Sequence, residues 1–205
     1  RGTILLNGND TSGKTVYQVN RMGIARTFQN IRLFGQMTVE ENVLVAFNES
    51  FSYHMGGAIF RTPKFWKQER EMHAKAIDLL KIFGLEGLAE TEAANLPYGA
   101  QRKLEIARAL ATDPKVLLLD EPSAGLSPML QDETFIRVRQ VNKAGVSVVI
   151  VEQNARRCLQ ICDRGYVLDQ GRNAYSGKGR DLMNDPKVVS LYLGNLEEEV
   201  EEEGR

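Results

Sequence analysis

Residues 95–128 read NLPYGAQRKLEIARALATDPKVLLLDEPSAGLSP, and this stretch decides the fold. Its centre, VLLLD at 116–120, is a continuous apolar run that ends in a carboxylate. Helical sequence precedes the run at 100–112 and follows it at 128–143, where Gly145 marks the stop. Apolar runs that alternate with helices are typical of a parallel sheet covered by helices on both faces. The stretch therefore predicts an α/β fold with Asp120 at the carboxyl end of a buried strand.

The same alternation continues on either side of this stretch. Further strands are predicted at 23–28 (GIARTF), 146–151 (VSVVIV) and 164–168 (RGYVL). A short strand at 3–6 (TILL) is followed by a turn at Asn7-Gly8. The runs at 116–120, 146–151 and 164–168 supply the strands of the predicted parallel sheet.

The region between the first strands and residue 95 is mostly helical. A helix is expected at 38–47, where Thr38 can cap the N-terminus and Glu41 completes a capping box. A longer amphipathic helix is expected at 64–83, stopped by Gly84. Residues 48–63 predict a loop, so a helical lobe is inserted into the α/β core.

Composition fits a globular protein. The chain has 205 residues, of which 42% are hydrophobic and 26% charged, with no run of about 18 apolar residues. Cys158 and Cys162, four residues apart, are expected to pack as small apolar groups, and both histidines to serve as surface or packing residues. The Glu-rich end, 196–205, predicts a disordered acidic tail.

Asp120 and Glu121 are the main candidates for chemistry. Ligands of open α/β sheets bind at the carboxyl ends of the strands, where a carboxylate can hold Mg²⁺ and a second one can act as a general base. The alternative is that both residues merely end a strand at the surface. Gly99, just ahead of a helix, would leave backbone N–H groups free for an anion, or would simply begin the helix.

Residues 8–15, GNDTSGKT, match the phosphate-loop pattern G-x-x-x-x-G-K-[ST]. That motif needs a buried strand before it and a packed helix after it. Only residues 3–6 precede it here, and residues 16–22 allow barely two helical turns. A turn followed by a short helix is therefore the preferred interpretation, and a true phosphate loop the alternative.

The order of five segments resembles that of the ABC-type ATPases. LPYGAQ (96–101) resembles the ABC signature, 116–121 the Walker B strand with its catalytic glutamate, and 123–128 the D-loop. RTFQN (26–30) resembles the Q-loop, and VEQN (151–154) stands at the switch position. Within that class, the stretches 26–46, 96–110, 151–171 and 188–194 look like the importer family for branched-chain amino acids.

The resemblance implies a RecA-like P-loop NTPase core of mainly parallel sheet, an inserted helical subdomain and the remnant of a small antiparallel sheet. Residues 1–35 would hold the end of the antiparallel region and the Q-loop. Residues 36–100 would form the helical subdomain and 101–195 half of the core.

Site roles follow from the same resemblance. Glu121, Gln153 and Gln29 would be catalytic, and Asp120 and Gln29 would serve Mg²⁺. Tyr98, Gly99, Ala100, Gln101 and Ser127 would face an ATP held by a neighbouring ATPase subunit. Gln153 replaces the usual histidine; its amide can donate a hydrogen bond but cannot carry a proton.

The resemblance also implies partners and a place in the cell. These are a second ATPase subunit, identical or distinct, integral permease subunits, and indirectly an external substrate-binding protein, with no nucleic acid. The place is the cytoplasmic face of a bacterial inner membrane, as a peripheral subunit. Lys14 lies too close to Gln29 for the family's phosphate loop, so the true Walker A unit is expected to be absent and the 205-residue chain to hydrolyse ATP poorly alone.

Three alternatives remain open from the sequence. The first is a non-transport ABC-type ATPase, although no basic stripe with interleaved aromatics points to nucleic acid. The second is a small kinase that uses residues 8–15, which leaves 95–128 unexplained. The third is a catalytically impaired interaction fragment.

Overall fold

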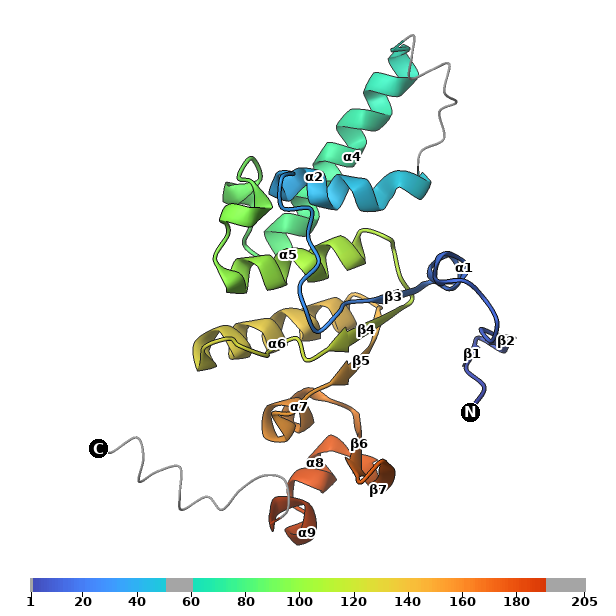
Figure 1. The fold of residues 1–205 in the computed structure, drawn as a ribbon, viewed down its shortest axis with the longest axis vertical. Helices are drawn as coiled ribbons and strands as arrows, with labels where there is room; N and C mark the ends of the chain where they lie inside the picture. Colours follow the sequence, from blue (N-terminus) through green and yellow to red (C-terminus); the bar gives the residue numbers. More distant parts are fainter. Residues whose placement is uncertain (1, 51–60, 191–205) are drawn as a thin grey trace, which may run out of the picture.

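The computed structural model describes residues 2–50 and 61–190 (Figure 1). Its strands are β1 (Leu5–Leu6), β2 (Asn9–Asp10), β3 (Ile24–Arg26), β4 (Val116–Asp120), β5 (Ser147–Val151), β6 (Arg164–Asp169) and β7 (Arg172–Lys178). Its α-helices are α1 (Val16–Arg21), α2 (Val39–Leu44), α4 (Pro63–Ile82), α5 (Tyr98–Leu110), α6 (Pro128–Lys143), α7 (Ala155–Ile161), α8 (Gly179–Met183) and α9 (Pro186–Val188). Short 3-10 helices are η1 (Val45–Ser50), η2 (Glu86–Leu88) and η3 (Ala93–Asn95).

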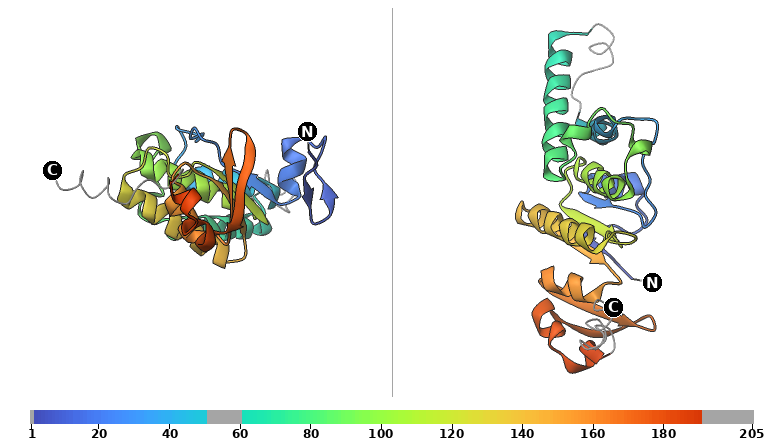
Figure 2. Two further views of the ribbon diagram at one scale, coloured as in Figure 1. Left: turned by 90° about the horizontal axis from the view of Figure 1, so that it is seen from below. Right: turned by 90° about the vertical axis from the view of Figure 1, so that its left-hand side faces the viewer.

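These elements are arranged in three parts along the long axis of the molecule. Figures 1 and 2 show α2 and α4 at one end, the parallel strands with α5 and α6 in the middle, and β6, β7, α8 and α9 at the other end. No helix among residues 2–50 and 61–190 is long and apolar enough to cross a membrane.

The central sheet has three parallel strands in the order β3-β4-β5. β4 is the middle strand, and its register aligns Leu118 with Arg26 on one side and with Val149 on the other. The strands at 23–28, 116–120 and 146–151 are thus confirmed. They place Asp120 at the carboxyl end of the central strand.

One face of this sheet is covered and the other is open in the described part of the chain. Leu117 and Leu119, at most 1% exposed, belong to one apolar cluster with residues of α5 and α6. On the opposite face, Val149 is 53% and Val151 61% exposed. Successive right-handed crossovers in one direction put their helices on the same side. For these residues, the prediction of a sheet covered on both faces is wrong.

The helical lobe packs against α5 through buried side chains of α2 and α4. Thr38 and Glu41 form the predicted capping box at the start of α2, which continues into η1 rather than as one helix to residue 47. α4 is followed by Gly84 with φ of 67°, the left-handed conformation that a glycine stop provides. The loop predicted at 48–63 begins inside η1, and residues 51–60 lie outside the described residues.

Two antiparallel hairpins flank the parallel sheet. β1 and β2 form the first, while β3 already belongs to the parallel sheet, so the antiparallel part of residues 1–35 is confined to 5–10. β6 pairs antiparallel with β7, which corrects the prediction of 164–168 as a further parallel strand. Gln170 and Gly171, both with positive φ, make the tight turn that returns the chain.

The cysteines behave as packing residues. Burial raises the pKa of the Cys158 thiol to about 12 and also raises the pKa of Cys162, so both remain thiols near neutral pH. The acidic tail predicted at 196–205 lies outside the described residues.

Candidate functional site

The site begins where β4 ends. Glu121 follows Asp120 directly and has φ of 45°, a left-handed conformation that costs a non-glycine residue about 1–2 kcal/mol. Its N–H donates to the carbonyl of Val151 at 2.9 Å, and its carbonyl accepts from the N–H of Ala124 at 3.1 Å. The chain therefore makes a tight turn at the carboxyl end of β4.

Two amides bracket the Glu121 carboxylate. Gln29 Nε2 donates to Oε2 at 2.9 Å, and Gln153 Nε2 donates to Oε1 at 2.9 Å. Gln29 comes from the segment after β3 and Gln153 from the segment after β5, so three neighbouring strand ends converge. Each carboxylate oxygen keeps a second lone pair, which leaves Glu121 able to accept a proton from water.

The Asp120 carboxylate has a cationic partner that the sequence analysis missed. Arg26 Nη2 lies 2.8 Å from Asp120 Oδ2, with 58% and 30% of the two side chains exposed. The sequence could have indicated this partner. A strand that runs parallel to VLLLD and ends in arginine carries that side chain to the same edge of the sheet. An exposed pair of this kind contributes little to stability and can open for a ligand.

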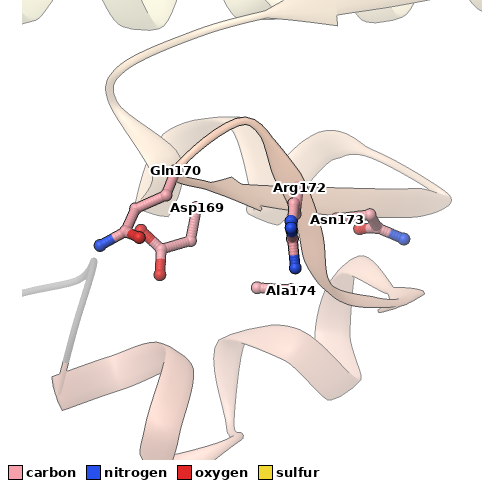
Figure 3. Close-up of a pocket in the computed structure, with 5 residues that line it drawn as sticks. All are labelled: Asp169, Gln170, Arg172, Asn173 and Ala174. Atoms are coloured by element: carbon pink, nitrogen blue, oxygen red, sulfur yellow. The ribbon is translucent and has the colours of Figure 1, made fainter.

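A small cavity lies beside Glu121. It has a volume of about 160 Å³ and is lined by Glu121, Ser123, Ala124, Gln131, Glu152, Gln153 and Asn154. A larger hollow of about 590 Å³ lies at the β6–β7 turn, where Figure 3 shows Asp169, Gln170, Arg172, Asn173 and Ala174 along the strand ends. All five of these residues are exposed on one hairpin, so we assign the site to the strand tip instead.

The residues predicted to face a nucleotide held by a neighbouring subunit differ in how exposed they are. Tyr98 begins α5 and is 47% exposed, while Ala100 and Gln101 are half-buried. Gln101 Nε2 donates to the carbonyl of Leu96 at 2.9 Å, so its side chain folds back on the chain.

The prediction that Gly99 lies on an open face is wrong. Gly99 is buried, and a Cβ added there would lie 3.0 Å from Leu130 Cδ1. An added Cβ would therefore press on the end of the Leu130 side chain in α6, and Leu126 Cδ2 in the preceding loop would lie 3.7 Å from it. The N–H groups of the first helical turn, rather than a glycine surface, are what α5 can offer an anion.

The D-loop segment touches the start of α5. A Cβ at Gly125 would lie 3.3 Å from Tyr98 Cε1, which places the tyrosine ring over this loop. Ser127, at the N-cap position of α6, is exposed and makes no side-chain capping bond. Tyr98 and Ser127 are therefore both open to a neighbouring molecule.

Residues 8–15 lack the features of a phosphate loop. β1 and β2 are two-residue strands, and neither they nor α1 has a buried residue. Backbone N–H groups that would cradle phosphate are engaged locally: Ser12 donates to Asp10 Oδ1 at 2.8 Å and Thr15 to Gln18 Oε1 at 2.9 Å. The bond from Ser12 holds the pKa of Asp10 below its usual value. The structure supports the interpretation as a turn and short helix.

Oxygen ligands at the strand tip suit a hard cation. The described residues contain no cluster of three or more His, Cys, Asp or Glu side chains arranged for a metal. Mg²⁺ does not need one, since it commonly takes one or two protein oxygens together with phosphates. Asp120 offers a carboxylate, and the Oε1 of Gln29 remains available because Nε2 makes its bond to Glu121.

A parallel α/β sheet with an acid pair at the tip of its middle strand, bracketed by amides from both neighbouring strands, defines a nucleotide hydrolase of the α/β class. A family model described as ABC transporter matches residues 1–124. The chain belongs to the ABC transporter family of ATP-binding proteins.

Individual relatives agree with this assignment. The chain is 39% identical over 196 residues to the high-affinity branched-chain amino acid transport ATP-binding protein LivG of Escherichia coli K12, covering 94% of this chain and 76% of that protein. It is 36% identical to the probable LivG of Archaeoglobus fulgidus, covering 98% and 77%. Among solved structures, an ATP-binding cassette of an ABC transporter in its ADP conformation matches with a TM-score of 0.75 and 31% identity, covering 95% and 78%.

Proposed function

We propose that this protein is the ATP-binding and ATP-hydrolysing subunit of an importer for branched-chain amino acids. The single observation that carries the hydrolytic part is Glu121, held at the end of β4 between the amides of Gln29 and Gln153. The importer and its cargo are supported by LivG-type relatives that match over almost the whole chain.

The arrangement suits phosphoryl transfer to water. That reaction depends on positioning and charge stabilisation more than on covalent chemistry. Glu121 would orient and deprotonate the attacking water, while Gln29 and Gln153 keep its carboxylate aimed from both sides. Gln153 can donate a hydrogen bond to a phosphate oxygen, although its amide cannot carry a proton.

Asp120 and Gln29 are the residues we propose to hold Mg²⁺. When bound, the ion would neutralise charge on the phosphate oxygens. Arg26 neutralises Asp120 in its present arrangement. Its exposed side chain can turn aside, so the carboxylate would be free for the cation when nucleotide binds.

The open face of the sheet is where we propose that a phosphate-binding segment packs. Parallel sheets are covered on both faces, and here Val149 and Val151 lie exposed beside the acid pair. Residues 8–15, the only match to the phosphate-loop pattern in the sequence, are folded as a separate exposed hairpin and helix. A strand–loop–helix unit against this face would bring the phosphates to Asp120 and Glu121.

A second ATPase subunit would complete the nucleotide site. Tyr98 and Ser127, exposed at the starts of α5 and α6, would contact an ATP held by that subunit, with backbone N–H groups of α5 facing its phosphates. Integral permease subunits and an external substrate-binding protein would supply the pathway and the selectivity. The complex would place this protein on the cytoplasmic face of the inner membrane.

The test is uptake by membranes that carry the intact protein. We expect vesicles with its permease subunits and external binding protein to accumulate labelled leucine, isoleucine or valine when ATP is inside. Glu121→Gln should abolish uptake without displacing the protein from the permease. Hydrolysis that proceeds equally well with no membrane partner, together with no uptake by the assembled vesicles, would instead support a non-transport ABC-type ATPase.

A further inference from the structure

A buried guanidinium lies directly beneath the catalytic turn. Arg102, in the second turn of α5, is 0% exposed, and Glu105 one helical turn later is 2% exposed. Their charges meet at 2.7 Å, from Arg102 Nη1 to Glu105 Oε2. The described residues thus include a fully desolvated ion pair in the helix that faces the tip of β4.

The remaining donors of Arg102 all go to backbone carbonyls around the site. Nη2 donates to the backbone carbonyl of Asp120 at 2.9 Å and to that of Glu121 at 2.5 Å. Nε donates to the backbone carbonyl of Pro122 at 3.3 Å. Nη1 donates to the carbonyl of Phe28 at 2.7 Å, next to Gln29. A guanidinium has five N–H donors, and every one is used here.

This pattern joins three segments that carry the chemistry. The carbonyls of three successive residues, 120 to 122, point at one side chain, which fixes the left-handed backbone of Glu121. Glu105 Oε1 also accepts the N–H of Phe28, at 3.5 Å. The start of the Q-loop and the Walker B turn are therefore held by the same pair in α5.

Stability alone does not explain a charged pair here. Replacing a buried ion pair by well-packed apolar side chains is often neutral or stabilising. The stability of the fold therefore does not require a charged pair at these two positions. Only a planar fork with five donors, however, can satisfy converging carbonyls from two different strand ends. Lysine offers three donors from one nitrogen and cannot span them.

We propose that Arg102, oriented by Glu105, is a positioning residue for hydrolysis: it sets the backbone of Glu121 and links it to Gln29 and to the helix that meets the neighbouring subunit. This inference rests on the proposed function, because it assigns Arg102 a role only through Glu121. A shift of α5 would then be transmitted to the catalytic turn through one side chain.

The test measures steady-state ATP hydrolysis by the intact protein in its transporter complex. For Arg102→Lys we expect kcat to fall about 10- to 100-fold, the usual effect of a small misplacement, with KM for ATP changed less than about threefold. For Glu105→Gln we expect a smaller loss with the same pattern. Lys103→Met is the matched control, because Lys103 lies on the same helix and pairs with Glu133 rather than with the site; its kcat should stay within about twofold.

A double substitution separates positioning from general structure. If Arg102 acts through Glu121, adding Arg102→Lys to Glu121→Gln should lower kcat no further, since coupled residues are not additive. Multiplied losses in the double variant would overturn the inference. If Arg102→Lys does not fold, the same comparison is made with Glu105→Gln, alone and combined with Glu121→Gln. An unchanged rate in Glu121→Gln would instead refute the catalytic role given to Glu121 in the proposed function, whereas an effect of Glu121→Gln with none of Arg102→Lys refutes this inference alone.

Discussion

Replacing Glu121 by Gln should reduce ATP hydrolysis by the assembled transporter at least about 100-fold, the contribution expected of a general base. The substitution preserves the shape of the side chain and one of the two oxygens that accept from Gln29 and Gln153. The amide facing the new NH2 must turn its own oxygen toward it, and the acceptor that takes a proton from water is lost. Because binding does not require that acceptor, ATP should still bind. The trapped nucleotide can be measured by rapid filtration with labelled ATP.

The control is a carboxylate outside the site. Glu71 is exposed on α4 and pairs only at 3.9 Å with Lys67, one turn away. Glu71→Gln should leave hydrolysis within about twofold of wild type. A Glu121→Gln protein that hydrolyses ATP at the wild-type rate would show that another group activates the water, and the role given to the tip of β4 would be wrong.

Gly179→Ala should lower the free energy of unfolding of the C-terminal part of the protein by about 3 kcal/mol, since overpacking against backbone cannot relax cheaply. Gly179 begins α8 where it crosses α7. An added Cβ would lie 2.4 Å from the carbonyl oxygen of Leu159 and 2.6 Å from that of Cys162. The buried residues of the small core of this part are Leu159, Leu182 and Val188, with Cys162, Val167, Tyr175 and Met183 partly buried against them.

Hydrogen exchange and urea denaturation measure this effect. We expect the amides of β6 and β7 to exchange faster in Gly179→Ala, with those of β4 unchanged, because local opening follows separate packing units. Gly87→Ala is the matched control: nothing lies within 4 Å of a Cβ there. Equal stability of both variants would mean that α8 does not fix the hairpin on α7.

Much of the fold could be predicted because local rules and packing agree. VLLLD between two helices predicts a buried parallel strand, and Thr38 with Glu41 predicts a capped helix. The acid pair follows, because the end of such a strand lies at a sheet edge. Gln29 and Gln153 could be named only through the family resemblance, since neither has a local pattern that marks it.

Other features depend on contacts that no local pattern specifies. β7 was missed because RNAYSGK has no apolar periodicity; it becomes a strand only by pairing with β6. Gly99 was assigned to an open face because a helix start exposes N–H groups, whereas its packing depends on Leu130, far along the chain.

The buried pair in α5 had a signal that was overlooked. Arg102 lies three residues after Gly99 and four before Ile106, on a stripe whose other members are buried. A charge on a buried stripe indicates a specific partner, because an unpaired buried charge is too costly. Which carbonyls it contacts, however, could be known only from the turn after β4.

The most direct test of the strand tip as the nucleotide site is electron paramagnetic resonance of Mn²⁺ bound to the intact protein with ATP. Asp120→Asn should weaken ATP-dependent Mn²⁺ binding at least about tenfold, because even residues that only orient a metal ligand contribute that much. Lys14→Ala should leave it unchanged, since Lys14 belongs to the exposed segment after β2. Retained binding in Asp120→Asn together with loss in Lys14→Ala would move the site to residues 8–15 and contradict the assignment of Asp120 and Glu121.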